Sequence, residues 1–246
     1  MNLIVCKDYN EMSEKAARIV AACVTLKPDC VIGLATGSTP VGMYKCLIEK
    51  NKAGKLDFSR VRTYNLDEYY PIDPTNEQSY RYFMDKNLFD SINIDKANTH
   101  VMNGKCEDPE KETADYDKAI EAAGGIDIQV LGIGRNGHIG FNEPNDSLDT
   151  KTHVTYLTES TLSANSRFFS SIDEVPKKAI TMGVSTILKS KKIVMLASGS
   201  SKHHVIKELL SEKVNTAVPA TLLNIHRDVV VICDEEAYYG NDTEKC

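Results

Sequence analysis

Residues 126–144 read Ile-Asp-Ile-Gln-Val-Leu-Gly-Ile-Gly-Arg-Asn-Gly-His-Ile-Gly-Phe-Asn-Glu-Pro, and this stretch decides the fold. Its first seven residues, 126–132, form a nearly continuous apolar run, which is typical of a parallel strand buried on both faces. Glycines and polar residues follow at once, so we expect the strand to end at a loop that carries chemistry.

The rest of the chain repeats this alternation of apolar runs with helical patterns. Further strands are predicted at 3–6, 30–35, 61–65, 154–157, 193–197 and 229–233, and helices at 10–26, 40–50, 78–88, 109–123 and 202–210. Such alternation predicts an α/β fold in which a parallel sheet has helices on both faces. The 246 residues contain no linker and no repeat, so we expect a single domain over 1–246. Ligands of such sheets bind at the carboxyl ends of the strands.

Composition excludes several classes of protein. The 29 Lys and Arg against 35 Asp and Glu give a net charge of −6, which argues against a nucleic-acid partner. No apolar stretch approaches the ~20 residues of a membrane span, and the N-terminus lacks the pattern of a signal peptide. The seven cysteines form no C-x-x-C pair, so a cytoplasmic location is expected. An anionic substrate must be held by local groups, because the overall charge does not attract it.

The loop from Gly134 to Glu143 is the first candidate for catalysis. Its glycines match G-x-G-x-x-G, but Pro144 comes too soon for the long helix of a dinucleotide site, so we take the match as accidental. The glycines instead allow the backbone to fold tightly against a substrate. His138 is the natural acid–base group, and Glu143 can orient it or relay protons through it. The six histidines show no metal-ligand spacing, so no metal is expected.

Two other strand ends carry unusual residues. Thr36, Gly37, Ser38 and Thr39 precede Pro40 and a predicted helix, where Thr39 can cap the helix and the loop can bind an anion. An ordinary capped loop is the alternative, and the loop is not a Walker A motif, so ATP is not implied.

Asp67 and Glu68 follow the strand at 61–65. Two adjacent carboxylates at a strand end suggest catalysis. The alternative is that Asp67 caps a turn and Glu68 faces water. Arg167 and Lys202 complete the set as cations that can hold phosphate, although most single cations serve only to solvate a surface.

Five segments, at 33–40, 64–69, 136–144, 165–169 and 199–202, together resemble the glucosamine-6-phosphate deaminase family. The resemblance runs in order over nearly the whole chain, and the segment from His138 to Pro144 is highly specific. It implies a Rossmann-like sandwich and conversion of glucosamine 6-phosphate, an aldose, to the ketose fructose 6-phosphate with loss of ammonium. No cofactor is needed for that reaction.

The resemblance also implies a division of labour among the residues. His138, with Glu143 and Asn136, opens the sugar ring, and Asp67 takes the proton from C2 and returns it at C1. A partly desolvated carboxylate suits that step, because burial raises its pKa. The phosphate is expected on the loop 36–39, Arg167 and Lys202, where its binding energy fixes C1 and C2 against Asp67.

This chain departs from the family's pattern in two ways. Asn136 stands where some members have Asp; we expect it to accept from the imidazole N–H of His138 and to set the tautomer. Allosteric members carry Arg-x-Lys after the Asn-Glu-Pro motif and a longer C-terminal segment, whereas this chain has residues 153–155, His-Val-Thr, and ends at Cys246. We therefore expect no effector site for N-acetylglucosamine 6-phosphate, and a monomer or small homo-oligomer. Residues 157–180 are expected to form a lid.

Two alternative functions stay open. A 6-phosphogluconolactonase resembles this family in fold and in its sugar-phosphate loop, but it hydrolyses a lactone and does not need Asp67 as a base. A non-catalytic sugar-phosphate sensor is the other alternative, and it would bind the sugar phosphate without releasing ammonia.

Overall fold

The computed structural model describes residues 1–246 except 166–170, 172–173 and 242–246. Its centre is a seven-stranded sheet with the strand order β1-β10-β9-β6-β2-β3-β5, and every neighbouring pair is parallel. The strands are β1 (Asn2–Cys6), β2 (Val31–Leu34), β3 (Arg62–Asn65), β5 (Thr99–His100), β6 (Ile128–Gly132), β9 (Lys192–Ala197) and β10 (Val229–Asp234). The apolar runs at β6, β9 and β10 are buried, as expected of inner strands covered on both faces.

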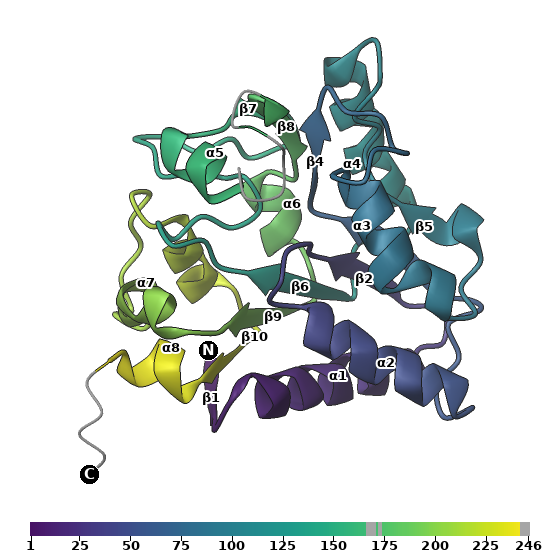
Figure 1. The fold of residues 1–246 in the computed structure, drawn as a ribbon, viewed down its shortest axis with the longest axis horizontal. Helices are drawn as coiled ribbons and strands as arrows, with labels where there is room; N and C mark the ends of the chain where they lie inside the picture. Colours follow the sequence, from purple (N-terminus) through teal and green to yellow (C-terminus); the bar gives the residue numbers. More distant parts are fainter. Residues whose placement is uncertain (166–170, 172–173, 242–246) are drawn as a thin grey trace.

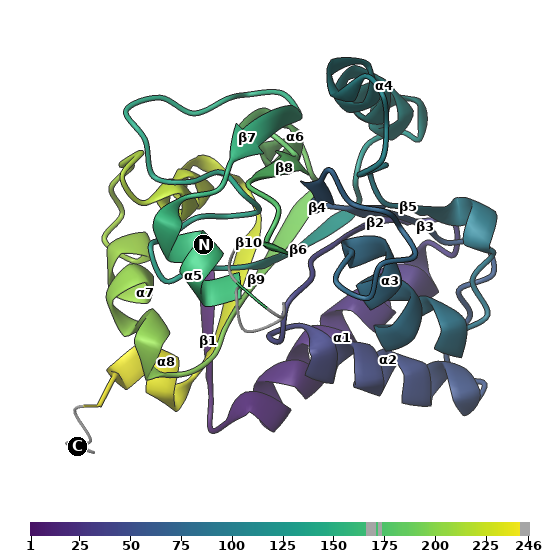
Figure 2. The ribbon, with the colours of Figure 1, turned by 45° about the horizontal axis from the view of Figure 1, so that its top comes forward.

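Helices cover both faces of this sheet (Figure 1). One face packs against α1 (Tyr9–Leu26), α2 (Val41–Lys52) and α3 (Tyr80–Asn87), which share one apolar core with it. The other face packs against α4 (Pro109–Ala122), α6 (Val184–Leu188), α7 (His203–Leu209) and α8 (Glu235–Tyr239). Figure 2 shows α1 and α2 together beneath the sheet and α4 above it. The predicted α/β sandwich is therefore confirmed.

Polar residues start several of these helices where the sequence places them. Asp8 accepts a hydrogen bond from the backbone N–H of Glu11 at the start of α1, and Asp108 accepts one from Lys111 just before Pro109 opens α4. Such bonds satisfy N–H groups that have no partner inside the helix. The observed bounds lie within two residues of the predicted ones for these helices and for α2 and α3.

A second sheet was not predicted. It has three antiparallel strands in the order β4-β8-β7, with β4 at Asp67–Tyr70, β7 at His153–Tyr156 and β8 at Lys178–Thr181. It stands beside the carboxyl ends of the parallel strands (Figure 1), next to α5 (Glu159–Asn165). Its register pairs Asp67 with Thr181. The chain after β3 therefore continues as a strand of another sheet, and not as the loop that we expected.

Short 3-10 helices complete the described elements: Phe89–Ser91, Lys96–Asn98, Ser200–Lys202 and Pro219–Ile225. No helix among the described residues is long and apolar enough to cross a membrane.

The chain order of the strands reverses between β2 and β6. From β2 the chain adds β3 and then β5 on one side, and from β6 it adds β9 and then β10 on the other. The loops after two such strands leave in opposite directions and open a crevice between them, which is where open α/β sheets bind ligands. The loops 35–40 and 133–144 both leave from this point, so the fold brings these two candidate loops to the same place.

Candidate active site

The loop after β6 folds back on itself through its glycines. The Gly134 N–H donates to the His138 carbonyl at 2.9 Å, and the Gly137 N–H donates to the Gly134 carbonyl at 3.1 Å. Gly137 and Gly140 have φ of +84° and +59°, a region that favours glycine. No helix forms between β6 and β7. The tight loop is confirmed, and so is the conclusion that the G-x-G-x-x-G match is not a dinucleotide fingerprint.

Glu143 is the centre of a hydrogen-bonded cluster. Its Oε2 lies 3.2 Å from Nδ1 of His138 and accepts from Nδ2 of Asn136 at 2.6 Å, while its Oε1 accepts from the hydroxyl of Thr161 at 2.5 Å. Burial raises the pKa of Glu143, but the bonds from His138, Thr161 and Asn136 outweigh it, so the pKa falls below its usual value. An ionised Glu143 can therefore hold one imidazole nitrogen, Nδ1, and leave Nε2 for proton exchange.

Asn136 has a different role from the one predicted. It does not accept from the imidazole; its side-chain carbonyl accepts from the backbone N–H of His138 at 3.2 Å, and its amide donates to Glu143. Glu143 contacts the ring instead. The reason is the turn at Gly137, which places the Asn136 side chain beside the backbone and not beside the ring of His138.

The imidazole of His138 lies over Gly134. A Cβ added to Gly134 would stand 2.4 Å from Nε2 of His138 and 2.5 Å from two ring carbons, which is an overlap with the ring. Gly134 is thus needed to leave room for His138, and not for an unusual backbone angle. The sequence singled out this glycine only as one of several that allow the loop to fold tightly.

Asp67 begins β4 and lies against the same loop. Its Oδ2 is 3.6 Å from the position that a Cβ on Gly140 would take. The carboxyl therefore lies beside Gly140, which follows His138 by two residues in the sequence. Its side chain is buried, and no group among the described residues donates a hydrogen bond to its carboxyl or forms an ion pair with it. Burial, with a smaller effect from the charge of Glu68, raises the pKa of Asp67 to about 8. A carboxyl of this kind is a stronger base than an exposed one.

Glu68 points away from this site into the protein and not into water, which corrects the alternative considered for it. Its carboxylate accepts from the backbone N–H groups of Tyr69, Tyr80 and Arg81 at 2.8–2.9 Å. Burial raises the pKa of Glu68 to about 7, although these three bonds oppose the rise. Glu68 therefore ties β4 to the first turn of α3 and holds its neighbour Asp67 in place.

The loop of Thr36, Gly37, Ser38 and Thr39 lies at the same sheet edge, but Thr39 does not cap a helix. α2 begins at Val41, with Pro40 before it and no side chain capping it. Gly37 and Ser38 are exposed, and Gly37 has φ of +86°. Tyr9 of α1 fixes the loop, because its hydroxyl donates to the Ser38 carbonyl and accepts from the Gly42 N–H. The predicted cap is wrong, but the loop does connect a strand, β2, to a helix, α2, as the sequence predicts.

Of the two predicted cations, Lys202 lies among the described residues and Arg167 does not. Nζ of Lys202 donates to the carbonyl of Ile133 at 2.6 Å, which brings Lys202 from the end of β9 to the first residue after β6. Arg167 lies outside the described residues. Three of the predicted loops and Lys202 thus meet at one edge. Within the described part of the chain, no three His, Cys, Asp or Glu gather as metal ligands would.

Thr161 belongs to this site and was missed. It lies on α5, and the motif recognised nearby in the sequence begins only at residue 165, after Thr161. The hydroxyl of Thr161 belongs to the Glu143 cluster. A signal exists in the sequence: Thr158 stands three residues earlier, and its side chain accepts from the Thr161 N–H as a helix cap does. That pattern locates the helix, but it does not reveal which carboxylate the helix approaches.

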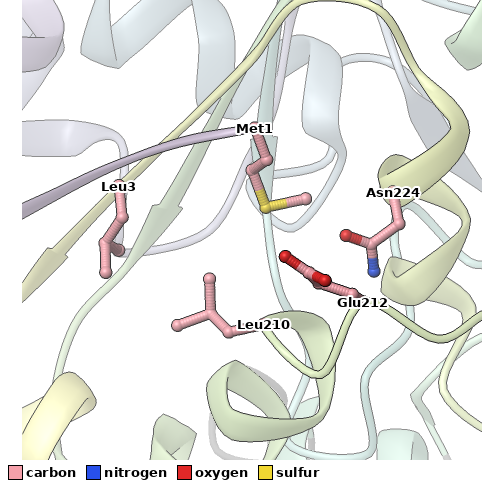
Figure 3. A pocket seen from close by; sticks show the side chains of 5 residues that line it. All are labelled: Met1, Leu3, Leu210, Glu212 and Asn224. Atoms are coloured by element: carbon pink, nitrogen blue, oxygen red, sulfur yellow. The ribbon is translucent and has the colours of Figure 1, made fainter.

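A separate pocket lies away from these residues. It is lined by Met1, Leu3, Leu210, Glu212 and Asn224, near the start of β1 (Figure 3). Because the sheet is parallel, the start of β1 is at the opposite edge from the carboxyl ends. None of the predicted site residues lines it, and its single carboxylate gives no pair of groups for acid–base work.

We expect the two buried carboxyls to make stability depend on pH. Their folded-state pKa values, about 8 for Asp67 and about 7 for Glu68, lie above the unfolded values of 3.8 and 4.5. The folded state therefore binds more protons, and the stability they contribute is complete near pH 4 and is lost as the pH rises through 7 and 8. Between pH 6 and 8 we expect the free energy of unfolding to fall on the order of 1 kcal/mol per pH unit.

Urea unfolding at several pH values measures this slope. Asp67→Asn should flatten it, because the amide does not titrate. An equal slope in native protein and variant would contradict the raised pKa of Asp67.

Comparisons with known proteins show the family to which the chain belongs. Residues 8–232 match the family model for glucosamine-6-phosphate isomerases/6-phosphogluconolactonase. Glucosamine-6-phosphate deaminases of Thermoanaerobacter sp. (strain X514) and Clostridium perfringens (strain 13 / Type A) are 57% and 56% identical over 237 residues. Those residues are 96% of this chain and 94% and 98% of the two relatives.

Solved structures of this family are similar to the chain in fold. A monomeric glucosamine-6-phosphate deaminase superposes with a TM-score of 0.94 at 45% identity, covering 96% of this chain and 98% of that one. A 6-phosphogluconolactonase from Leishmania guyanensis, with a TM-score of 0.75 and 21% identity over 98% of both chains, shares the fold.

Proposed function

Because the chain belongs to the family of glucosamine-6-phosphate isomerases and 6-phosphogluconolactonases, we propose that it converts glucosamine 6-phosphate and water to fructose 6-phosphate and ammonium. The observation that carries this is the buried carboxyl of Asp67 against the loop that holds His138. Removing a proton from carbon needs a base of raised pKa, and a lactone hydrolase has no such step. The reaction belongs to the breakdown of amino sugars.

Ring opening is the first step and falls to His138. A proton leaves the anomeric hydroxyl and one arrives at the ring oxygen, while the bond between C1 and that oxygen breaks. Glu143 fixes Nδ1 of His138, so Nε2 is the nitrogen that exchanges protons with the sugar. Asn136 keeps Glu143 ionised through the bond from its amide.

The carbon step falls to Asp67. Its carboxylate takes the proton from C2 of the open-chain sugar, giving an enolate. The enolate oxygen on C1 takes a proton from the ammonium group on C2, which leaves an enol with a neutral amine on C2. The same carboxyl returns a proton to C1, and the C2 amine becomes an imine. Water then adds to C2 and ammonia leaves, so the C–N bond is broken by water and the enzyme is classed as a hydrolase. Every step is a proton transfer or the addition of water, so the scheme needs no cofactor.

The phosphate is held away from the reacting carbons. The loop of Thr36, Gly37, Ser38 and Thr39, in which Gly37 and Ser38 are exposed, offers hydroxyls and backbone N–H groups, and Lys202 offers a charge. Arg167, which lies outside the described residues, is proposed as a further phosphate ligand. Binding the phosphate there fixes C1 and C2 beside Asp67.

A direct assay separates the candidate functions. Purified protein is incubated with glucosamine 6-phosphate and, separately, with 6-phosphogluconolactone, and both ammonium and lactone hydrolysis are measured. We expect ammonium and fructose 6-phosphate in equal amounts and no lactone hydrolysis above the spontaneous rate. Lactone hydrolysis alone would favour the lactonase, and binding of glucosamine 6-phosphate without ammonium would favour the sensor.

Assembly, location and regulation are also proposed from the family. We propose a cytoplasmic enzyme that is a monomer or small oligomer, since a monomeric deaminase is 45% identical to it. The lid over residues 157–180 stays a prediction; α5 and the start of β8 lie within it.

We expect hyperbolic kinetics, because residues 153–155 lack the basic pair of an effector site. The initial rate is measured against substrate with and without N-acetylglucosamine 6-phosphate. A sigmoidal curve, or activation by the acetylated sugar, would contradict the absence of an effector site.

A further inference from the structure

Thr161 connects α5 to the acid–base cluster through one carboxylate oxygen. The two oxygens of Glu143 have different partners. Oε2 contacts His138 and Asn136, and Oε1 is 2.5 Å from the hydroxyl of Thr161. Both Thr161 and Glu143 are buried, with 5% and 8% of their surface exposed. Water is therefore a poor substitute for the hydroxyl, and the bond is the one that holds Oε1 within the described residues.

The direction of this bond follows from the neighbouring hydroxyl. Thr158 donates its proton to the oxygen of Thr161 at 3.2 Å, and Thr161 donates its own to Glu143. An ionised carboxylate only accepts hydrogen bonds, so this order is the one that satisfies all three groups. The same Thr158 oxygen accepts from the Thr161 N–H, which fixes Thr161 at the first turn of α5. The hydroxyl is thus held in place before any substrate binds.

A carboxylate held at both oxygens cannot rotate. Without the bond from Thr161, the hydrogen bonds of Glu143 within the described residues are at Oε2 alone, and the plane of the carboxylate is free to tilt. Nδ1 of His138 then loses a fixed partner, and the direction of Nε2 toward the sugar is less defined. Removal of a donor to the ionised form also raises the proton affinity of Glu143.

We propose that Thr161 is a positioning residue for ring opening, whose hydroxyl holds the Glu143 carboxylate in the orientation that fixes the imidazole of His138. The proposal rests on the function proposed above. Thr161 acts through Glu143 and makes no contact with the reacting atoms. A purely structural role, in which the bond only secures α5, would change stability and leave kcat for ammonium release as it is.

The chain offers a matched control for the test. The hydroxyl of Thr152 is also buried and also lies 2.5 Å from a carboxylate oxygen, that of Asp117 on α4, which is not part of the Glu143 cluster. Thr161→Val and Thr152→Val therefore remove the same kind of bond with the same change of shape. Thr161→Ser keeps the hydroxyl and is the variant that should restore function.

The expected results are specific. Thr161→Val should lower kcat for ammonium release about 10- to 100-fold, the loss expected for one hydrogen bond to a charged group, with KM nearly unchanged. Thr152→Val should keep native kcat, and Thr161→Ser should recover most of it. Native kcat in Thr161→Val, an equal loss in Thr152→Val, or no recovery in Thr161→Ser would overturn the proposal.

A second measurement does not depend on activity. Carbon-13 NMR of the labelled protein follows the Glu143 carboxyl with pH, and the pKa of Glu143 should rise in Thr161→Val and stay native in Thr152→Val. An unchanged Glu143 pKa in Thr161→Val would overturn the positioning role. If native protein releases no ammonium, the proposed function fails, and this titration still decides whether Thr161 controls Glu143.

Discussion

Asp67→Asn should lower kcat for ammonium release about 10²–10⁴-fold, the usual contribution of a positioned base. The amide has the shape of the carboxyl but cannot take the proton from C2. KM should change little, because the phosphate loop and Lys202 lie on other strand ends. At pH 8 the variant should also be more stable than native protein, because folding no longer buries a group that ionises in water.

Ring opening provides the control for this variant. His138 and Glu143 are untouched, so Asp67→Asn should still speed the exchange between the α and β anomers of glucosamine 6-phosphate, which magnetisation-transfer NMR measures. His138→Gln should lose both anomer exchange and ammonium release. If Asp67→Asn abolished anomer exchange as well, the division of the two steps between Asp67 and His138 would be wrong.

Gly134→Ala should lower kcat about 10²-fold or more while the protein stays folded. The added methyl group would overlap the imidazole, 2.4 Å from Nε2, so His138 must move. A displacement of about 1 Å of a catalytic group is enough for such a loss. Gly134 does not have a positive φ, so alanine brings no backbone strain there. Steady-state kinetics with a thermal melt measures both expectations.

Gly132→Ala is the matched control, two residues earlier at the end of β6. A Cβ there meets nothing within 4 Å, and its φ is also not positive. We expect native kcat and a similar melting temperature. Equal losses in the two variants would mean that the loop tolerates no alanine and that the space for His138 is not the reason for the loss.

The parallel sheet was predictable because its inner strands, at 128–132, 192–197 and 229–234, are mostly apolar, as expected of strands that are buried on both faces. The antiparallel sheet was not. β4 reads Asp-Glu-Tyr-Tyr, and its two carboxylates hide the strand character. The strand forms because β8 pairs with it from more than 100 residues away, a contact that local patterns do not contain.

The sequence allowed most residues of the site to be predicted, but not the hydrogen bonds between them. Strand order places the loops at 36–39 and 134–143 in one crevice, and the resemblance supplied Asp67. The exact partners depend on packing: Asn136 contacts Glu143 and the backbone, Glu68 holds α3, and Thr161 arrives from α5. Gly134 could be recognised as essential only once the His138 ring was seen to lie over it.

The pH dependence of kcat/KM for ammonium release by the native protein shows whether buried Asp67 is the base, because this ratio reports ionisation of the free enzyme. A base must be deprotonated to act, and the desolvated carboxyl of Asp67 has a pKa of about 8. We therefore expect kcat/KM to climb with pH and to level off above an apparent pKa of about 8. A limb near the ordinary carboxyl value of 3.8, or no ammonium at any pH, would contradict a buried Asp67 as the base.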